Sequence, residues 1–435
     1  MIQWLNERRA SSKLQNKRIK FSDSREWSFD EGRLRHKTGG FFSIEGVVCQ
    51  SLDPLLSGRQ QPIINQPEIG ILGFLVCETD GEFEWLVQAK GEPGNTHAIQ
   101  LAPSVQATYS NYMRRHGGAA TYYLNHFLCV KELMSDSLQS EQGTRFLRKF
   151  NRNAVSLVSE KLPLETENYR WLESGCIREA LGADYVINTD ARSVITTAPW
   201  RLVADGKAPF TGVKATTFLN GKLAQSYVEE ASLEVVAKMH DWLRQRRQEL
   251  DLRIHQCSLA DIQGWSLEDD CVVANDSNRE LAVEHYRVEA PGRERSQWDQ
   301  PLVRSPQIDE VVLICQEREG VLRFLLRPAY EIGLTGGVEI GPSYKKDGHV
   351  PEWLAPLVER GVGRDLISVQ QSDEGGRFME SQCLYKLVYL EPNHEIKDKE
   401  DNFWVTASEL ELICRSEKLL TNEARSVVSL LLSFA

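Results

Sequence analysis

A run of polar side chains follows a strand-like stretch of the sequence, between residues 88 and 100. Ahead of it Phe83, Trp85 and Val87 alternate as they would on one buried face of a strand. An ordinary turn would need only the residues at 93–95. The surplus of amides and charges predicts a polar site at the mouth of a sheet. The polar residues are Gln88, Lys90, Glu92, Asn95, His97 and Gln100.

The same stretch recurs in altered form 239 residues later, which is the separation of Gln61 from Gln300. In this register Glu92, Gly94 and Thr96 fall on Glu331, Gly333 and Thr335, and with small slips the match extends in both directions. Residues 188–193 resemble 422–426 once one residue is dropped. The repeat is too long for a solenoid unit. The sequence therefore predicts a tandem duplication, with one domain at residues 1–228 and another at 229–435.

The two repeats differ most in their polar residues. Lys90 is replaced by Ala329 and Asn95 by Leu334, and the run 105–112 has no counterpart at 344–348. Polar groups found in only one repeat are not needed for the fold. We therefore expect the first repeat to carry the chemistry. Glu92 recurs as Glu331, so a structural turn role and a functional role are equally compatible with it.

Composition narrows the class of protein. The chain is 41% hydrophobic and 26% charged, has no apolar run long enough for a membrane span, and begins with a polar segment, so we expect a cytoplasmic protein. Its nine cysteines include no C-x-x-C pair, and neither zinc nor a disulfide framework is suggested. A net charge of −11 argues against nucleic acid as a partner, although a local basic pocket for one phosphorylated ligand is compatible with it.

The predicted elements indicate an α+β fold, with one mixed sheet per repeat and helices on its faces. Hairpins are expected around Asp80-Gly81 and Glu319-Gly320. The remaining expectations are a short helix within 1–20 docked through Trp4-Leu5, strands at 27–46, 122–130 and 186–195, helices within 136–161 and 171–181, an exposed connection at 199–225 and a long helix at 229–252.

Standard catalytic signatures are absent from the sequence. It contains no P-loop, no G-x-G-x-x-G after a strand, no H-E-x-x-H and no G-x-S-x-G. The segment 178–182 is the nearest approach to a Nudix box, but it lacks the run of glutamates that would hold magnesium.

Four motifs together resemble the NDP-hexose 2,3-dehydratases. They are Q-A-K-x-E-P-G-N at 88–95, Q-L-A-P-S-V-Q-A-T-Y-S-N-Y at 100–112, R-x-H-G-G at 114–118 and D-x-R-S at 190–193. The resemblance covers essentially the whole chain. It implies two Nudix-like domains without hydrolase chemistry, a homodimer, and action on dTDP-4-keto-6-deoxy-D-glucose in deoxysugar biosynthesis, with a 3-ketoreductase downstream. The eroded motif at 327–334 departs from the family pattern and casts doubt on a second sugar site.

The reaction implied by this resemblance is a hydro-lyase step that needs no metal or redox cofactor. Its requirements are a base for the C3 proton, a donor to the leaving C2 hydroxyl and a cation beside the enolate oxygen. The candidates for the base of this implied reaction are Glu92 and His116, and Lys90 suits the enolate oxygen as a cation. Candidate substrate contacts are Gln88, Asn95, Gln106, Asn111 and Arg114 for the sugar nucleotide, Arg192 and Ser193 for the pyrophosphate, and Trp27 and Tyr112 for the thymine.

Several of these residues have structural alternatives. Trp27 fits a hydrophobic core, His116 an exposed loop and Lys90 a solvated strand end. Arg192 and Ser193 recur as Arg425 and Ser426, so a structural ion pair explains them equally well. A non-catalytic nucleotide-sugar binding protein is the alternative function, and a pyrophosphohydrolase is a weaker third.

Overall fold

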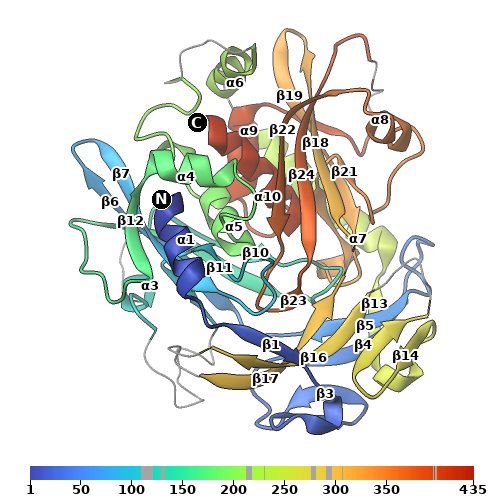
Figure 1. The fold of residues 1–435 in the computed structure, drawn as a ribbon. Helices are drawn as coiled ribbons and strands as arrows, with labels where there is room; N and C mark the ends of the chain where they lie inside the picture. Colours follow the sequence, from blue (N-terminus) through green and yellow to red (C-terminus); the bar gives the residue numbers. More distant parts are fainter. Residues whose placement is uncertain are drawn as a thin grey trace.

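The computed structural model describes residues 1–108, 121–128, 133–211, 218–229, 231–275, 281–290, 296–305, 307–394, 396 and 399–435. These form a mixed α+β structure of four sheets with helices packed among them (Figure 1). No helix in the described ranges combines the length and the apolar composition that a bilayer crossing requires.

Two seven-stranded mixed sheets share one strand order. In each, a central hairpin is extended on one side by a parallel strand and then an antiparallel one. The first contains β6 (Gly70–Thr79), β7 (Glu82–Gly91), β8 (Ile99–Ala102), β9 (Val105–Ala107), β10 (Ser135–Ser140), β11 (Phe150–Val158) and β12 (Tyr169–Glu173). The second contains β18 (Asp309–Arg318), β19 (Val321–Tyr330), β20 (Val338–Gly341), β21 (Tyr344–Lys345), β22 (Arg364–Ser372), β24 (Gln382–Leu390) and β25 (Phe403–Val405).

Two smaller sheets exchange strands between the halves of the chain. The first contains β2 (Trp27–Asp30), β3 (Arg33–His36), β4 (Ser43–Gln50) and β5 (Gln60–Asn65), and β13 (Arg253–Cys257) adds to β4. The second contains β14 (Trp265–Leu267), β15 (Cys271–Ala274), β16 (Ala282–Glu289), β17 (Gln297–Arg304) and β23 (Phe378–Met379), and β1 (Gln15–Arg18) adds to β16. Each half thus completes a sheet of the other.

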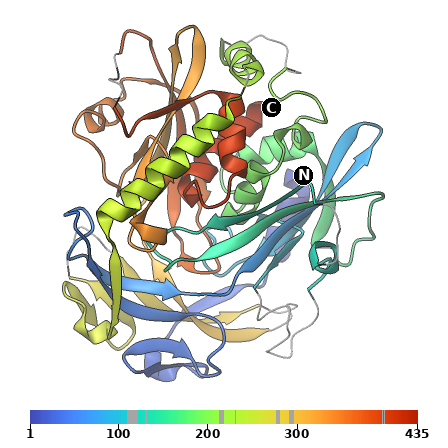
Figure 2. The same ribbon diagram turned by 180° about the vertical axis from the view of Figure 1, so that it is seen from behind.

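Helices fill the space between the two large sheets. In Figure 1, α4 (Ser174–Leu181), α5 (Thr189–Thr197), α9 (Ala407–Arg415) and α10 (Asn422–Val428) lie there, and α7 (Leu233–Leu250) crosses the opposite side of the molecule (Figure 2). A single apolar cluster runs through both halves at this level. The other helices are α1 (Ile2–Ser11), α3 (Asn125–Leu128), α6 (Phe218–Val228), α8 (Ala355–Glu359) and the 3-10 turns at 21–23, 200–202, 259–261, 335–337 and 429–434.

The expected hairpins are confirmed. β6 pairs antiparallel with β7 and β18 with β19. Both residues of each turn have positive φ, at 53° and 82° for Asp80-Gly81 and 54° and 80° for Glu319-Gly320, which suits the right-handed twist of the strands. The N-terminal helix is also confirmed, with Trp4 and Leu5 as its buried residues.

The expected helices within 136–161 are wrong, because these residues form β10 and β11. The central strand β11 lies between β6 and β10 and is covered on both faces, so its residues do not alternate as a half-exposed strand would. The strand expected at 122–130 is wrong over its described part, where α3 forms instead. At 171–181 the helix begins only at Ser174, although Gly182 does follow its end.

The strand expected at 186–195 is also wrong. Helix α5 occupies Thr189–Thr197, and the Asn188 side chain caps it by accepting a hydrogen bond from the Ala191 backbone. The segment from 199 is not an exposed connection throughout, since Trp200 and Phe210 are buried in the core. The long helix expected at 229–252 is confirmed in its central part as α7, but it starts at Leu233, after α6 has ended at Val228.

Candidate active site

The polar turn after β7 is held against a loop from the second half of the chain. The Gly94 backbone N–H donates to the Gly375 carbonyl at 2.7 Å, and the Glu380 N–H donates to the Gly94 carbonyl at 2.8 Å. A Cβ atom on Gly94 would lie 1.6 Å from the Phe378 carbonyl oxygen, so only glycine permits this approach. The turn and the loop at 372–380 are therefore closely packed and joined by two backbone hydrogen bonds.

Gly333 makes the same contact with the roles of the two halves exchanged: its turn belongs to the second half and the loop it meets belongs to the first. Its N–H donates to the Gly143 carbonyl at 2.8 Å, and the Arg148 N–H donates back to the Gly333 carbonyl at 2.7 Å. A Cβ atom on Gly333 would lie 1.8 Å from the Phe146 carbonyl oxygen. The loop at 140–148 in the first half thus corresponds to the loop at 372–380 in the second.

Glu92 is the centre of the polar cluster. Its side chain is buried, and Oε1 accepts a hydrogen bond from Gln106 Nε2 at 2.8 Å and lies 3.4 Å from Lys90 Nζ. Asn188, the cap of α5, donates to Gln106 Oε1 at 3.3 Å. Glu92 Oε2 is buried and has no hydrogen-bond partner among the described residues. One oxygen of the Glu92 carboxylate is therefore held by Gln106 beside Lys90, and the other has no described partner. This arrangement suits a general base.

Two further carboxylates lie around Glu92. Asp190 is in the first turn of α5 and Glu374 is in the loop from the second half. Burial raises the pKa of Asp190 well above its usual range, and the charges of Glu374, Glu141 and Glu92 add to this shift. Burial likewise raises the pKa of Glu374 to about 7. A neutral carboxyl group beside a charged one is a common way of providing an acid and a base in one site.

Two cations, Lys149 and Arg377, interact electrostatically with Glu374. Lys149 Nζ donates to Asn151 Oδ1 at 2.8 Å, and burial lowers the pKa of this lysine. The Arg377 guanidinium lies 4.2 Å from the centre of the Phe42 ring and donates to Gln66 Oε1 at 3.1 Å. Glu141 accepts from Asn151 at 2.7 Å and from Asn422 at 3.1 Å, so it joins this cluster to α10.

The corresponding position in the second half is an ion cluster. Lys345 Nζ lies 2.8 Å from Glu331 and 2.6 Å from Glu423, where the first half has Gln106, Glu92 and Asp190. Burial opposes the charged form of Lys345, but the charges of Asp347, Glu331 and Glu423 outweigh it and raise the pKa of Lys345 well above its usual range. The cation of the first half comes instead from Lys90, whose counterpart is Ala329. The two sites therefore have different charge arrangements on the same backbone.

Glu339 offers a test of how burial affects stability in this region. It stands where the first half has Gln100, and Ser140 Oγ donates to it at 2.5 Å. Burial raises its pKa to about 8. Because the folded state then holds the proton more tightly than the unfolded state, Glu339 lowers stability as pH rises from about 4.5 to 8, by up to roughly 1.4 kcal/mol per unit. We expect Glu339→Gln to unfold at higher urea than the parent at pH 8 and to lose this advantage at pH 5.

The matched control for that prediction is Glu352→Gln, which removes the same charge from an exposed side chain. It should follow the parent at every pH. If Glu339→Gln and the parent instead show parallel pH profiles of unfolding free energy, the carboxyl at 339 is not the group that titrates.

The structure brings several predicted residues together and places others elsewhere. Lys90, Glu92 and Gln106 are in direct contact, and Asn95 lies in the same turn, where its Nδ2 donates to the Ala98 carbonyl at 3.4 Å. Gln88 lies two residues before Lys90 on β7, and strand geometry gives the two side chains the same face. Asn111, Tyr112, Arg114 and His116 fall outside the described residues.

Trp27, Arg192 and Ser193 are engaged in the interior. Trp27 packs in the core of the smaller sheets and donates from Nε1 to the Asp299 carbonyl at 2.6 Å. Arg192 is fully buried and donates to the Ile187 and Ser372 carbonyls at 2.8 and 3.1 Å. Ser193 Oγ accepts from Arg425 Nε at 2.8 Å. These contacts tie the two halves together.

Sequence reasoning missed Asp190, Glu374, Asn188 and Lys149 as members of the cluster. Asp190 and Asn188 stand in or beside the D-x-R-S motif, and an Asn three residues before a helical amide was the available signal for the cap. The structure also corrects the repeat alignment here. Thr421 caps α10 as Asn188 caps α5, so Asp190 corresponds to Glu423 without a gap. Glu374 had no local signal, because it reaches the site from the other half.

A groove of about 500 Å³ beside β1 is basic in composition, and both Arg18 and Arg287 in its lining are paired with carboxylates. Arg18 pairs with Asp270 at 3.0 Å and Arg287 with Asp299 at 2.9 Å.

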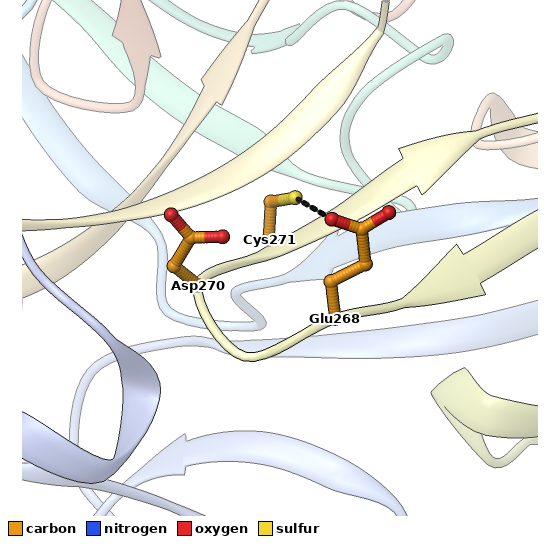
Figure 3. A group of neighbouring side chains, drawn as sticks. All are labelled: Glu268, Asp270 and Cys271. Carbon is orange, nitrogen blue, oxygen red and sulfur yellow. Dashed lines mark hydrogen bonds between the residues drawn. The ribbon is translucent and has the colours of Figure 1, made fainter.

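Among the described residues, Glu268, Asp270 and Cys271 form a group with metal-ligand atoms (Figure 3). The Cys271 thiol donates to Glu268 at 3.6 Å, and burial together with the charges of Glu268 and Asp270 raises its pKa to about 11.

Comparison with known proteins gives one consistent result. The family model described as NDP-hexose 2,3-dehydratase matches residues 1–197 and 236–431. Among similar proteins is dTDP-4-dehydro-6-deoxy-alpha-D-glucopyranose 2,3-dehydratase from Saccharopolyspora spinosa, 32% identical over 98% of this chain and 89% of that protein. Proteins of the same name from Amycolatopsis orientalis and Streptomyces violaceoruber are each 31% identical over 98% of this chain, and over 88% and 95% of their own lengths.

Proposed function

Because the chain belongs to the NDP-hexose 2,3-dehydratase family, we propose that it removes water across C2 and C3 of dTDP-4-keto-6-deoxy-D-glucose. The product is a 3,4-diketo-2,6-dideoxy sugar. The observation that supports this reaction most directly is the buried Glu92 carboxylate, with one oxygen held by Gln106 beside Lys90 and the other without a described partner.

The proposed mechanism begins at C3. The C4 ketone acidifies the C3 proton, and Glu92 removes it while Lys90 stabilises the negative charge that develops on the C4 oxygen. The enolate then reforms the ketone and expels the C2 hydroxyl. The resulting enol tautomerises to the diketone. Gln106 fixes the orientation of Glu92, and Gln88 and Asn95 are the proposed hydrogen-bond partners of the sugar hydroxyls.

Other candidate contacts retain the roles that family resemblance implies. Asn111, Tyr112 and Arg114 are proposed to contact the nucleotide, and His116 is the alternative base. For Arg192, Ser193 and Trp27 the interior contacts favour a structural role over direct substrate binding.

We also propose that the fold is a tandem duplication of a Nudix-like domain, with repeats at 1–228 and 229–435. The shared strand order of the two large sheets supports it. A homodimer in the cytoplasm, supplying a 3-ketoreductase with its labile product, completes the proposal. Light scattering of the purified chain tests the dimer.

The experiment that tests the function is mass spectrometry of dTDP-4-keto-6-deoxy-D-glucose incubated with the purified protein, with and without a 3-ketoreductase and NADPH. We expect the mass of one water to be lost, seen directly or as the trapped reduced product, or free dTDP to be released from an unstable diketo sugar. Unchanged substrate despite saturable binding would contradict the dehydratase and support the binding protein.

A further inference from the structure

The loop that joins β22 to β23 brings a carboxylate from the second half of the chain to the Glu92 site. The Cβ position of residue 376 lies 3.5 Å from Glu374 Oε1 and 4.0 Å from Glu92 Oε1. The distance between Glu374 Oε1 and Glu92 Oε1 therefore cannot exceed the sum of these two distances. At such a separation both carboxyl groups can reach a sugar carbon and its hydroxyl. Glu374 is half-buried, whereas Glu92 is almost fully buried.

The corresponding loop of the first half carries no such carboxylate. Gly143 and Gly375 make equivalent contacts with the opposite polar turns, so Gln142 is the counterpart of Glu374. Gln142 Nε2 donates to Asp373 Oδ1 at 3.1 Å. The same loop conformation thus forms with a glutamine, and the acid is present only where the loop faces Glu92 and Lys90. The loop does not need the Glu374 carboxyl for its fold. Because this carboxyl lies at the site of the proposed reaction, we expect it to take part in the reaction.

We propose that Glu374 is the general acid of the dehydratase site and delivers a proton to the C2 hydroxyl as it leaves. This inference rests on the proposed function. Glu92 takes the C3 proton, the C3–H electron pair forms the enolate, and the enolate pair then forms the C2–C3 double bond as the C2–O bond breaks. The hydroxyl takes the Glu374 proton and departs as water. In the tautomerisation that follows, the enol returns a proton to Glu374 and Glu92 gives its proton to C2, so both groups are restored.

The electrostatic surroundings suit this role. Glu374 is faced by Arg377 of its own loop, by Glu141 and Lys149 of the β10–β11 region, by Glu92 of the polar turn and by Asp190 of α5. Burial and the neighbouring carboxylates raise the pKa of Glu374 to about 7, although Arg377 and Lys149 oppose the shift. A substantial fraction of the group is therefore protonated at neutral pH and can donate. Activity should fall as pH rises through about 7, because the acid form is lost.

The test is Glu374→Gln, which installs the residue found at the corresponding position 142. In D₂O the variant should still exchange the C3 hydrogen of dTDP-4-keto-6-deoxy-D-glucose at a rate close to that of the parent. Water loss should be slower by roughly 10²–10⁴-fold, with KM changed little. The decline of kcat above pH 7 should disappear. Thermal unfolding should occur at or above the temperature of the parent, because the loop already accommodates glutamine in the other half and the change removes a carboxyl group whose pKa is raised in the folded state.

The control is Glu380→Gln, which removes the same charge from an exposed side chain at the other end of this loop and should leave turnover unchanged. The inference is overturned if Glu374→Gln turns over like the parent, or if exchange and water loss fall together, which would mean that the residue only shapes the site. Failure of the parent itself to release water would contradict the proposed function instead, so the two failures are distinguishable.

Discussion

Glu92→Gln should lower kcat by roughly 10²–10⁴-fold while the substrate still binds. The amide keeps the shape of the carboxylate and can still contact Gln106 and Lys90, but it cannot accept the C3 proton. Because proton removal is the first chemical step, solvent deuterium should no longer enter C3 of unreacted substrate. Isothermal titration with substrate, and product formation followed by mass spectrometry, separate the loss of turnover from any loss of affinity.

Its matched control is Glu331→Gln, the same change at the corresponding turn of the second half. Glu331 pairs with Lys345 rather than with a catalytic group, so activity per folded molecule should be that of the parent. If Glu92→Gln retains parental turnover, Glu92 is not the base, and the role passes to His116. If the two variants lose activity equally, a general change in the turns accounts for the effect.

Gly94→Ala and Gly333→Ala should each destabilise the protein by about 3 kcal/mol or more. A Cβ atom would lie 1.6 or 1.8 Å from a backbone carbonyl oxygen, and a backbone group cannot rotate away as a side chain can. The turn and the facing loop would have to separate and lose their two hydrogen bonds. The midpoint of urea unfolding measures this loss.

Activity should separate the two glycine variants. Under conditions where both remain folded, Gly94→Ala should lose turnover, because it displaces Glu92 from the loop at 372–380. Gly333→Ala should retain turnover, because its turn faces the loop without the acid. Gly221→Ala on α6 is the control, since the added methyl would meet nothing within 4 Å beyond its chain neighbours and the backbone of its own helix, and stability should not fall. Parental stability of Gly94→Ala would contradict the close approach.

Local sequence patterns predicted the parts of the fold that depend on neighbouring residues. The hairpin around Asp80-Gly81 combines period-two alternation with a turn that needs two positive φ angles, and both signals lie within a few residues. The segment at 136–161 has no comparable signal. Its apolar residues are spaced as in a helix because they belong to two strands and a connecting loop, and the pairing of β11 with β6 joins residues some 80 positions apart.

In the candidate site, too, the residues within local motifs could be predicted from the sequence, and those brought in by long-range contacts could not. Lys90 was found because only the first repeat keeps the lysine, and Glu92 because it stands in the polar run that follows the strand. Asn95 belongs to the motif at 88–95 and Gln106 to the motif at 100–112. Glu374 reaches Glu92 only through the docking of Gly94 on the loop at 372–380, a contact between residues some 280 positions apart that no local pattern encodes. Arg192 and Ser193 were chosen for their chemistry, but their hydrogen bonds to the interior depend on the helix packing.

The exchanged strands also bear on how the chain is synthesised. β1 pairs with β16 through partners such as Gln15 and Glu289, so during synthesis β1 waits for roughly 270 more residues before its partner exists. At typical translation rates this delay is on the order of tens of seconds. Throughout it, β4 also lacks β13 and presents an open edge to other chains. The nascent N-terminal half is therefore expected to depend on chaperones until residues 253–289 emerge and supply β13 and β16, the partners of β4 and β1.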